Sequence, residues 1–190
     1  MPKLSQRINI DLPYIQDTVD SELRAIAGHN WVSHVNQKEY IGDWRVLALR
    51  TQQGSVNAHP ILQGFQIEET DAWVDLPVLK SLPGIAALVS AIPVEYKSIR
   101  LMELTPNSHI KVHQDRGLCI ENGEARLHIP LQTHNCLYFV SNGVQLPMAA
   151  GQLWYINADK PHEVKNESPI SRINLVMDCE VNDWLLEQVH

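Results

Sequence analysis

The sequence predicts a mostly β fold, a double-stranded β-helix (jelly roll) with N-terminal helices packed on one of its two sheets. From residue 95 onward, short apolar segments alternate with turn-forming residues, which is typical of antiparallel strands. With one earlier segment they make about eight or nine strands, the number that the cupin-like jelly roll requires. Polar and apolar residues alternate along two of these segments, as they do in strands whose two faces differ.

Residues 11–28 are predicted to form a helix, because apolar residues recur at helical spacing and acidic residues lie on the other side. The apolar set is Ile15, Val19, Leu23 and Ile26, and the acidic set is Asp17, Asp20 and Glu22. Gly28 suits the end of this helix. After a polar segment, residues 44–50 are predicted as a strand and residues 55–76 as loop.

Pro77 is placed to begin a second helix, which runs to about residue 92 unless Pro83-Gly84 interrupts it or delays its start. The predicted strands that follow are 95–104, 109–113, 126–133, 137–140, 144–148, 151–156, 162–165 and 171–179. Asn142-Gly143 is a hairpin signal, and residues 182–189 could form a short terminal helix.

Length and composition bound the protein class. The chain has 190 residues without repeats or linkers, so a single domain over 1–190 is expected, with a mixed N-terminal part (1–94) and a jelly-roll core (about 95–180). A net charge of −7 and the lack of Lys/Arg runs weigh against a nucleic-acid partner. The apolar stretches are too short to span a membrane. The oligomeric state is not readable from the sequence.

The first residues contain no apolar run of the kind that a signal peptide needs. The three cysteines, Cys119, Cys136 and Cys179, are scattered and show no paired spacing. An odd, scattered set fits a reducing cytosol better than a disulfide framework, so a cytoplasmic location is expected.

Alternation within two predicted strands indicates where a pocket could lie. In one strand Leu127, Ile129 and Leu131 share a face, and Arg126, His128 and Pro130 share the other. In a second strand Ile173, Leu175 and Met177 share a face, and Arg172 and Asn174 share the other. The polar faces could turn to water or line the lumen of the jelly roll, and the sequence alone leaves both arrangements open.

The candidate metal ligands are His113, Asp115 and His162. His113-Gln114-Asp115 ends a predicted strand, and His162 begins another after a turn. A His-x-Asp/Glu match alone is worth little, since about one is expected by chance in a chain of this composition. Two imidazoles and one carboxylate nevertheless form the facial triad of non-haem Fe(II) oxygenases, which leaves metal positions open. Arg172 follows on a strand ten residues after His162.

The ordered set of motifs resembles the aspartyl/asparaginyl β-hydroxylase family of Fe(II)/2-oxoglutarate oxygenases. The resemblance covers roughly residues 95–180 and is carried by segments 104–115, 126–131, 151–156, 161–164 and 171–173. It implies that His113, Asp115 and His162 bind Fe(II), that Arg172 pairs with the distal carboxylate of 2-oxoglutarate, and that O₂ is consumed. By the same resemblance His128 approaches the metal-proximal carboxylate of the co-substrate. No catalytic residue beyond the metal ligands is implied.

The resemblance also places Arg126 toward the substrate. A buried guanidinium without a partner is costly, so Arg126 is expected to meet a substrate carboxylate. The alternative is an ion pair within the chain, with Glu103 or Glu124 as the partner.

One departure from the family bears on the substrate. Animal members that hydroxylate Asp and Asn in protein domains have Gly where this chain has Asp115, so the full triad is more similar to bacterial members, some of which act on free amino acids. A serine that helps to hold the co-substrate in the animal enzymes corresponds to Met102 here.

The sequence therefore predicts a 2-oxoglutarate-dependent hydroxylase of an amino acid or aminoacyl residue. Its substrate would be a small molecule or a peptide. Two other classes stay open: a cupin-type metalloenzyme that does not use 2-oxoglutarate, and a non-catalytic metabolite-binding jelly roll. Arg172 is the residue that separates the first from the proposed class, because only a co-substrate pocket requires it.

Overall fold

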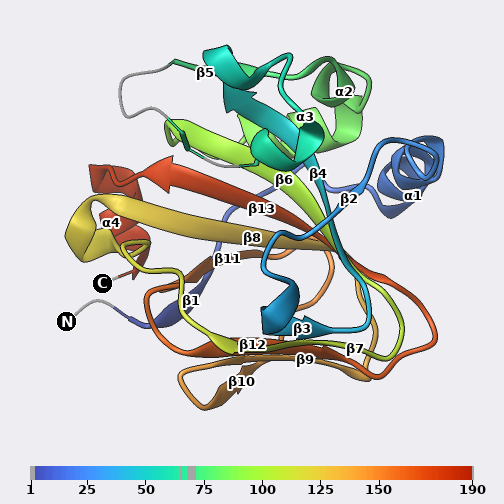
Figure 1. Cartoon of the computed structure of the whole chain (residues 1–190). Helices are drawn as coiled ribbons and strands as arrows, with labels where there is room; N and C mark the ends of the chain where they lie inside the picture. The colour runs from blue at the N-terminus through green and yellow to red at the C-terminus, as the bar shows by residue number, and fades with distance from the viewer. Residues whose placement is uncertain (1–2, 65, 68–71, 190) are drawn as a thin grey trace.

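The computed structural model describes residues 3–64, 66–67 and 72–189, and these form two antiparallel sheets that face each other (Figure 1). The large sheet contains β1 (Ser5–Ile8), β2 (Val32–Ser33), β4 (Trp44–Gln52), β5 (Trp73–Asp75), β6 (Tyr96–Leu104), β8 (Glu124–Gln132), β11 (Leu153–Ile156) and β13 (Arg172–Glu180). The small sheet contains β3 (Tyr40–Ile41), β7 (Ser108–His113), β9 (Leu137–Ser141), β10 (Val144–Leu146) and β12 (His162–Asn166).

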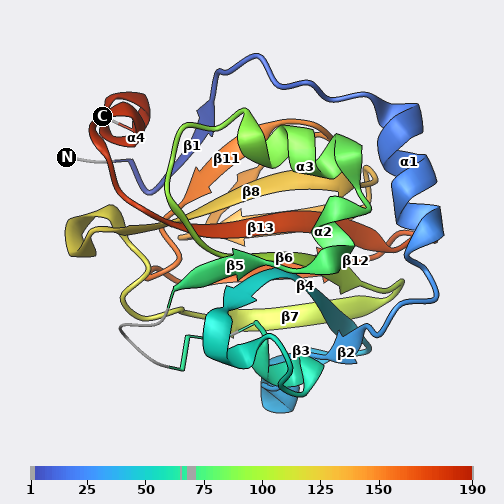
Figure 2. The same cartoon turned by 90° about the horizontal axis from the view of Figure 1, so that it is seen from above.

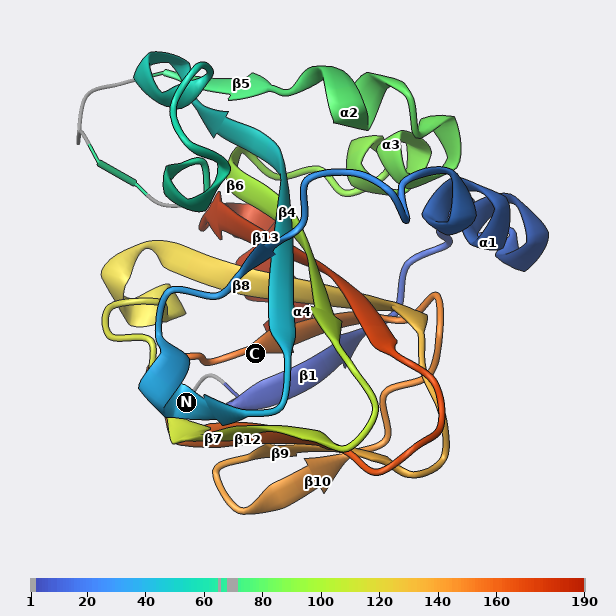
Figure 3. The same ribbon diagram turned by 45° about the vertical axis from the view of Figure 1, so that its right-hand side comes forward.

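The strand order identifies the topology. The large sheet runs β1-β11-β8-β13-β6-β4-β2, with β5 paired to β4, and the small sheet runs β10-β9-β12-β7-β3. From β6 onward the chain passes back and forth between the sheets, which appear as upper and lower layers in Figure 3. This winding is that of a double-stranded β-helix, so the predicted fold class is confirmed.

All nine predicted strands are present, with ends that differ by two residues or fewer. Four further strands, β1, β2, β3 and β5, were not predicted. They have two to four residues each, and a segment of that length is too short to show a two-residue period. The predicted loop 55–76 contains β5 and the 3₁₀ turn Pro60–Leu62, while residues 65 and 68–71 lie outside the described part.

The helices α1 (Gln16–Ala25), α2 (Pro77–Lys80) and α3 (Pro83–Ser90) cover the outer face of the large sheet (Figure 2). Pro83-Gly84 does interrupt the predicted second helix, and α4 (Asp183–Val189) is the terminal helix. Beneath the helices, Leu127, Ile129 and Leu131 of β8 are fully buried in the main core. The apolar faces of β8 and β13 therefore meet helices, and their polar faces turn into the lumen between the sheets.

Helix α1 is shorter than predicted, and two residues depart from the predicted pattern of buried apolar and exposed acidic side chains. Ile15 precedes the helix and is exposed, whereas Glu22 is buried. The Glu22 carboxylate accepts hydrogen bonds from the backbone N–H groups of Gly84 (2.5 Å) and Ile85 (2.9 Å) at the start of α3. A carboxylate at a helix N-terminus satisfies amides that have no partner within the helix. None of the described helices is long and apolar enough to cross a membrane.

Replacing Glu22 with alanine is expected to lower the free energy of unfolding by about 1–3 kcal/mol, because two amides at the start of α3 lose their acceptor. Urea unfolding followed by circular dichroism measures the change. Asp17→Ala is the control, since Asp17 is an exposed acid on the same helix, and its cost should stay under about 1 kcal/mol. Equal losses in the two variants would contradict a capping role for Glu22.

Candidate metal centre and adjoining pocket

A cavity of about 380 Å³ lies between the two sheets, within the usual range for small-molecule sites. The large sheet contributes Arg126, His128 and Arg172 to its lining, and the small sheet contributes Phe139 and His162. The polar residues of β8 and β13 therefore line the lumen, which decides the question that alternation alone left open.

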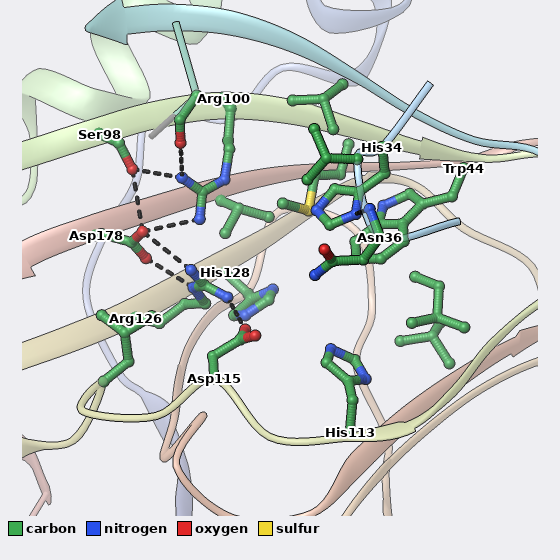
Figure 4. Close-up of a pocket in the computed structure, with 18 of the residues that line it drawn as sticks. His34, Asn36, Trp44, Ser98, Arg100, His113, Asp115, Arg126, His128 and Asp178 are labelled. Atoms are coloured by element: carbon green, nitrogen blue, oxygen red, sulfur yellow. Dashed lines mark hydrogen bonds and ion pairs between the residues drawn. The ribbon is translucent and has the colours of Figure 1, made fainter. Parts of the chain in front are cut away.

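The structure brings the three predicted metal ligands together. One ligand atom from each of His113, Asp115 and His162 lies within 4.8 Å of the others. His113 and His162 are directly opposite each other on the paired strands β7 and β12, and their ring centroids are 4.2 Å apart. Figure 4 shows His113 and Asp115 on one stretch of chain at the floor of the pocket.

A register shift in the small sheet aims His113 into the lumen. Between β7 and β12 the paired residues are His162 with His113 and Val164 with Ile110, so β7 has one extra residue over this stretch. Strict alternation from the inward-facing Ile110 would turn His113 outward. The β-bulge reverses that alternation, a device that re-aims side chains next to functional sites.

Both histidines are held in one tautomer. Nδ1 of His113 lies 2.8 Å from the carbonyl oxygen of Lys111, and Nδ1 of His162 lies 3.0 Å from that of Lys160. A carbonyl can only accept, so each Nδ1 carries a proton, and in the neutral form of the ring Nε2 keeps its lone pair for a metal. Nε2 of His162 lies 3.9 Å from Oδ2 of Asp115. Burial, followed by the electrostatic interaction with the neighbouring His113, lowers the pKa of His162 to about 4, which keeps the ring of His162 neutral.

Asp115 lies in the loop after β7, and backbone contacts tie this loop to the segment before His162. The N–H of Asp115 donates to the carbonyl of Ala158 (2.8 Å), and the N–H of Gly117 donates to the carboxylate of Asp159 (3.0 Å). Two segments more than 40 residues apart in sequence are thereby fastened side by side. The donor set, two imidazoles and a carboxylate with open space beside them, fits Fe(II).

Arg172 is buried (4% exposed) and faces the cavity, and no described residue supplies it with a counter-charge. One of its terminal nitrogens has no hydrogen-bond partner among the described residues. Burial lowers the pKa of Arg172 to about 10. Its guanidinium carbon lies 5.6 Å from the ring centroid of Phe139, which supplies an aromatic wall. A buried cation left this way fits an anionic ligand.

His128 is buried beside the same space. Nδ2 of Asn174 donates to Nδ1 of His128 (2.7 Å), which leaves the ring proton on Nε2 as a donor for a ligand. Burial, followed by the charges of Arg172 and Arg126, holds the pKa of His128 well below its usual value. A neutral donor at this position suits a carboxylate oxygen. Met102, at the position of the family serine, also lines the cavity and has no hydrogen-bond donor to offer a carboxylate there.

The premise that Arg126 lacks a partner is wrong. Its Nε and Nη2 donate to the two oxygens of Asp178 (2.7 and 3.0 Å), and its Nη1 donates to Asp115. Asp178 is directly opposite Arg126 on the neighbouring strand β13. The alternative of an ion pair within the chain therefore holds, but the partners of Arg126 are Asp178 and Asp115. The two predicted partners are engaged elsewhere, Glu103 with Arg45 and Glu124 with Lys97.

Sequence reasoning missed several residues of the pocket. Ser98 and Arg100 of β6 and Asp178 of β13 point into the lumen beside Arg126 (Figure 4). The sequence does carry a signal for these three: Ser98 and Arg100 alternate with the apolar Ile99 and Leu101, and Asp178 stands between Met177 and Cys179. His34 stacks on Trp44 with ring centroids 3.6 Å apart, and both line the cavity. The sequence carries no comparable signal for this pair.

A double-stranded β-helix whose lumen holds a His-Asp-His triad, together with an arginine that no described residue neutralises, defines the class of Fe(II)/2-oxoglutarate oxygenases. Within that class, the sequence pattern of the family described as "Aspartyl/Asparaginyl beta-hydroxylase" matches residues 15–181. The chain belongs to this family of hydroxylase enzymes, and the family implies Fe(II) and 2-oxoglutarate.

Comparison with individual proteins agrees with this assignment. L-proline cis-4-hydroxylase of Rhizobium meliloti (strain 1021) is 25% identical over 143 residues, which cover 73% of this chain and 48% of the relative. The chain thus spans about half the length of this curated relative.

Two solved structures share the fold at low sequence identity. An oxidoreductase of the 2OG-Fe(II) oxygenase family from Burkholderia pseudomallei has a TM-score of 0.54 and 16% identity, over 84% of this chain and 77% of that one. A Pseudomonas putida prolyl-4-hydroxylase has a TM-score of 0.51 and 12% identity, over 93% and 94%.

Proposed function

We propose that this protein is an Fe(II)- and 2-oxoglutarate-dependent hydroxylase that acts on an unactivated C–H bond of an amino acid or aminoacyl residue. The observation that carries the proposal is Arg172, a buried cation without a counter-charge among the described residues, in one cavity with the His113-Asp115-His162 triad. A metal site alone would not need it. A dicarboxylate co-substrate that occupied the cavity between the triad and Arg172 would balance its charge.

Different side chains of this pocket would bind the metal and the two ends of the co-substrate. His113, Asp115 and His162 would hold Fe(II), which together with 2-oxoglutarate and O₂ would supply the oxidising chemistry; 2-oxoglutarate would be converted into succinate and CO₂. Arg172 would bind the distal carboxylate of 2-oxoglutarate through its planar fork, and the ring of Phe139 beneath it keeps water away. His128 would donate from Nε2 to the proximal carboxylate.

We infer that the substrate carries a carboxylate, and that a small free amino acid is the best candidate. Among the described residues that line the cavity there are five cations and three carboxylates; with Arg172 assigned to the co-substrate, one positive charge remains in excess. The cations are Lys97, Arg100, Arg116, Arg126 and Arg172, and the carboxylates are Asp115, Glu124 and Asp178. A positive wall favours anionic ligands. The likeness to L-proline cis-4-hydroxylase supports a free amino acid.

A substrate panel tests the proposal. The purified protein is incubated with Fe(II), 2-oxoglutarate and either free amino acids, L-proline among them, or peptides containing Asp or Asn, and succinate is measured. A free amino acid is expected to stimulate succinate release above the uncoupled rate, with a product heavier by one oxygen atom in mass spectrometry. Stimulation by peptides alone would contradict a free amino acid as the substrate, but it would still support the hydroxylase activity.

The two other classes give different results in the same assay. A metalloenzyme that does not use 2-oxoglutarate would bind Fe(II) and release no succinate with any substrate. A non-catalytic binding module would bind ligands without forming any product.

A further inference from the structure

A chain of charged side chains runs from the wall of the large sheet to the candidate iron ligand Asp115 (Figure 4). At its centre, the carboxylate of Asp178 accepts four hydrogen bonds. Two come from Arg126, one from Nη2 of Arg100 (2.8 Å) and one from the hydroxyl of Ser98 (3.0 Å). Nη1 of Arg100 also donates to that hydroxyl (2.6 Å), which fastens the group together.

The sheet itself sets the geometry of this cluster. Asp178 and Arg126 are directly opposite each other on β13 and β8, and Arg100 on β6 is paired with Val176, two positions from Asp178. Side chains in directly opposed or diagonal positions on one face of a sheet are within reach of each other. The position of the Arg126 guanidinium is therefore determined by three adjacent strands.

Asp115 has no such support from a strand, because β7 ends at His113. The loop fixes the backbone of Asp115 through the carbonyl of Ala158, but its carboxylate is restrained by Nη1 of Arg126. Because Nε and Nη2 of Arg126 are both bound to Asp178, Nη1 is presented to Asp115 in one direction. The planar fork of arginine transmits an orientation in a way that a lysine ammonium could not.

We propose that Asp178 is a positioning residue of the iron site: it anchors Arg126, which in turn holds the carboxylate of Asp115 in the orientation that the metal requires. The inference rests on the proposed Fe(II) site. It assigns to Arg126 a role within the protein, in place of a direct bond to the substrate, and it gives Asp178 and Arg100 a function that the sequence did not suggest.

Asp178→Asn removes the charge that anchors Arg126 and keeps the shape of the side chain. Fe(II) affinity of the apoprotein, measured by titration of tryptophan fluorescence, is expected to fall about 10–100-fold, the usual effect of changing a partner of a metal ligand. The apparent KM for 2-oxoglutarate at saturating Fe(II) should change less than threefold, because Arg172 is outside the cluster. Excess Fe(II) should restore part of kcat. A residue that only supports the fold would not produce this selective dependence on iron.

Arg126→Lys tests the same link from its other end and keeps the buried positive charge. It should lose Fe(II) affinity to a similar extent, and the double variant should lose no more than either single variant, because the two residues act through one connection. If Asp178→Asn does not fold, as judged by near-UV circular dichroism, Arg126→Lys decides alone. Glu103→Gln is the matched control, since Glu103 also pairs with an arginine on the large sheet (2.6 Å to Arg45) but lies outside the cavity lining.

Folded variants that bind Fe(II) within threefold of the wild type would overturn the proposal and leave the hydroxylase function intact. Additive losses in the double variant would also overturn it, because they would mean that the two residues act independently. A wild-type chain that binds no Fe(II) would instead contradict the proposed function, and this proposal with it. The wild-type titration therefore separates the two failures.

Discussion

Replacing Arg172 with methionine is expected to raise the apparent KM for 2-oxoglutarate by about 10²–10³-fold while Fe(II) affinity stays nearly unchanged. Removing one partner of a buried charge pair costs roughly 3–5 kcal/mol, which corresponds to that range or more. The effect should be confined to the co-substrate because Arg172 is on β13, across the lumen from the metal ligands of the small sheet and its adjoining loop. Methionine fills similar space, so the fold should persist.

The measurement is the rate of succinate formation as a function of 2-oxoglutarate concentration at saturating Fe(II). Arg45→Met is the control, since Arg45 is a partly exposed arginine of the large sheet outside the cavity lining. An unchanged KM in Arg172→Met would remove Arg172 from the co-substrate site. It would favour a metalloenzyme of the same fold that does not use 2-oxoglutarate.

Alanine at His113, Asp115 or His162 is expected to abolish turnover and to weaken Fe(II) binding while the fold survives. Changes to the partners of metal ligands typically lower metal affinity or activity about 10–100-fold, so the loss of a ligand itself should lower them at least that much. Fe(II) titration and succinate release are measured on each variant, with thermal unfolding as the check on the fold. His109→Ala is the control on the same strand, because His109 pairs with Glu163 and does not line the cavity.

The Asp115→Ala variant also tests whether two histidines alone can support activity. Animal relatives have Gly at this position, and a variant that kept full activity would show that two histidines suffice here. The hydrogen bond from Arg126 to Asp115 points to the opposite result, since the variant would leave a buried guanidinium nitrogen without its acceptor. We therefore expect inactivation together with some loss of stability.

The sequence was sufficient for the features that depend on local pattern. The nine main strands follow from two-residue alternation and turn residues. The same alternation places Leu127 and Leu131 on one buried face of β8, but it does not tell whether that face meets the helices or the lumen. The candidate ligands and Arg172 were found because their types and order match one kind of chemistry. Glu22 shows the limit of this reasoning, because its burial depends on the helix α3 more than 60 residues away.

The tertiary structure alone decided which side chains meet inside the lumen. Pairing between strands that are distant in sequence places Asp178 against Arg126, and the packing of one sheet against the other places Arg172 beside Phe139. The bulge in β7 turns His113 inward, although the sequence of that strand does not show it. Contacts of this kind depend on strand register, which the whole set of packed layers determines together. The sequence by itself determined the chemical groups available to this site, and the register of the two sheets determined which of them act together.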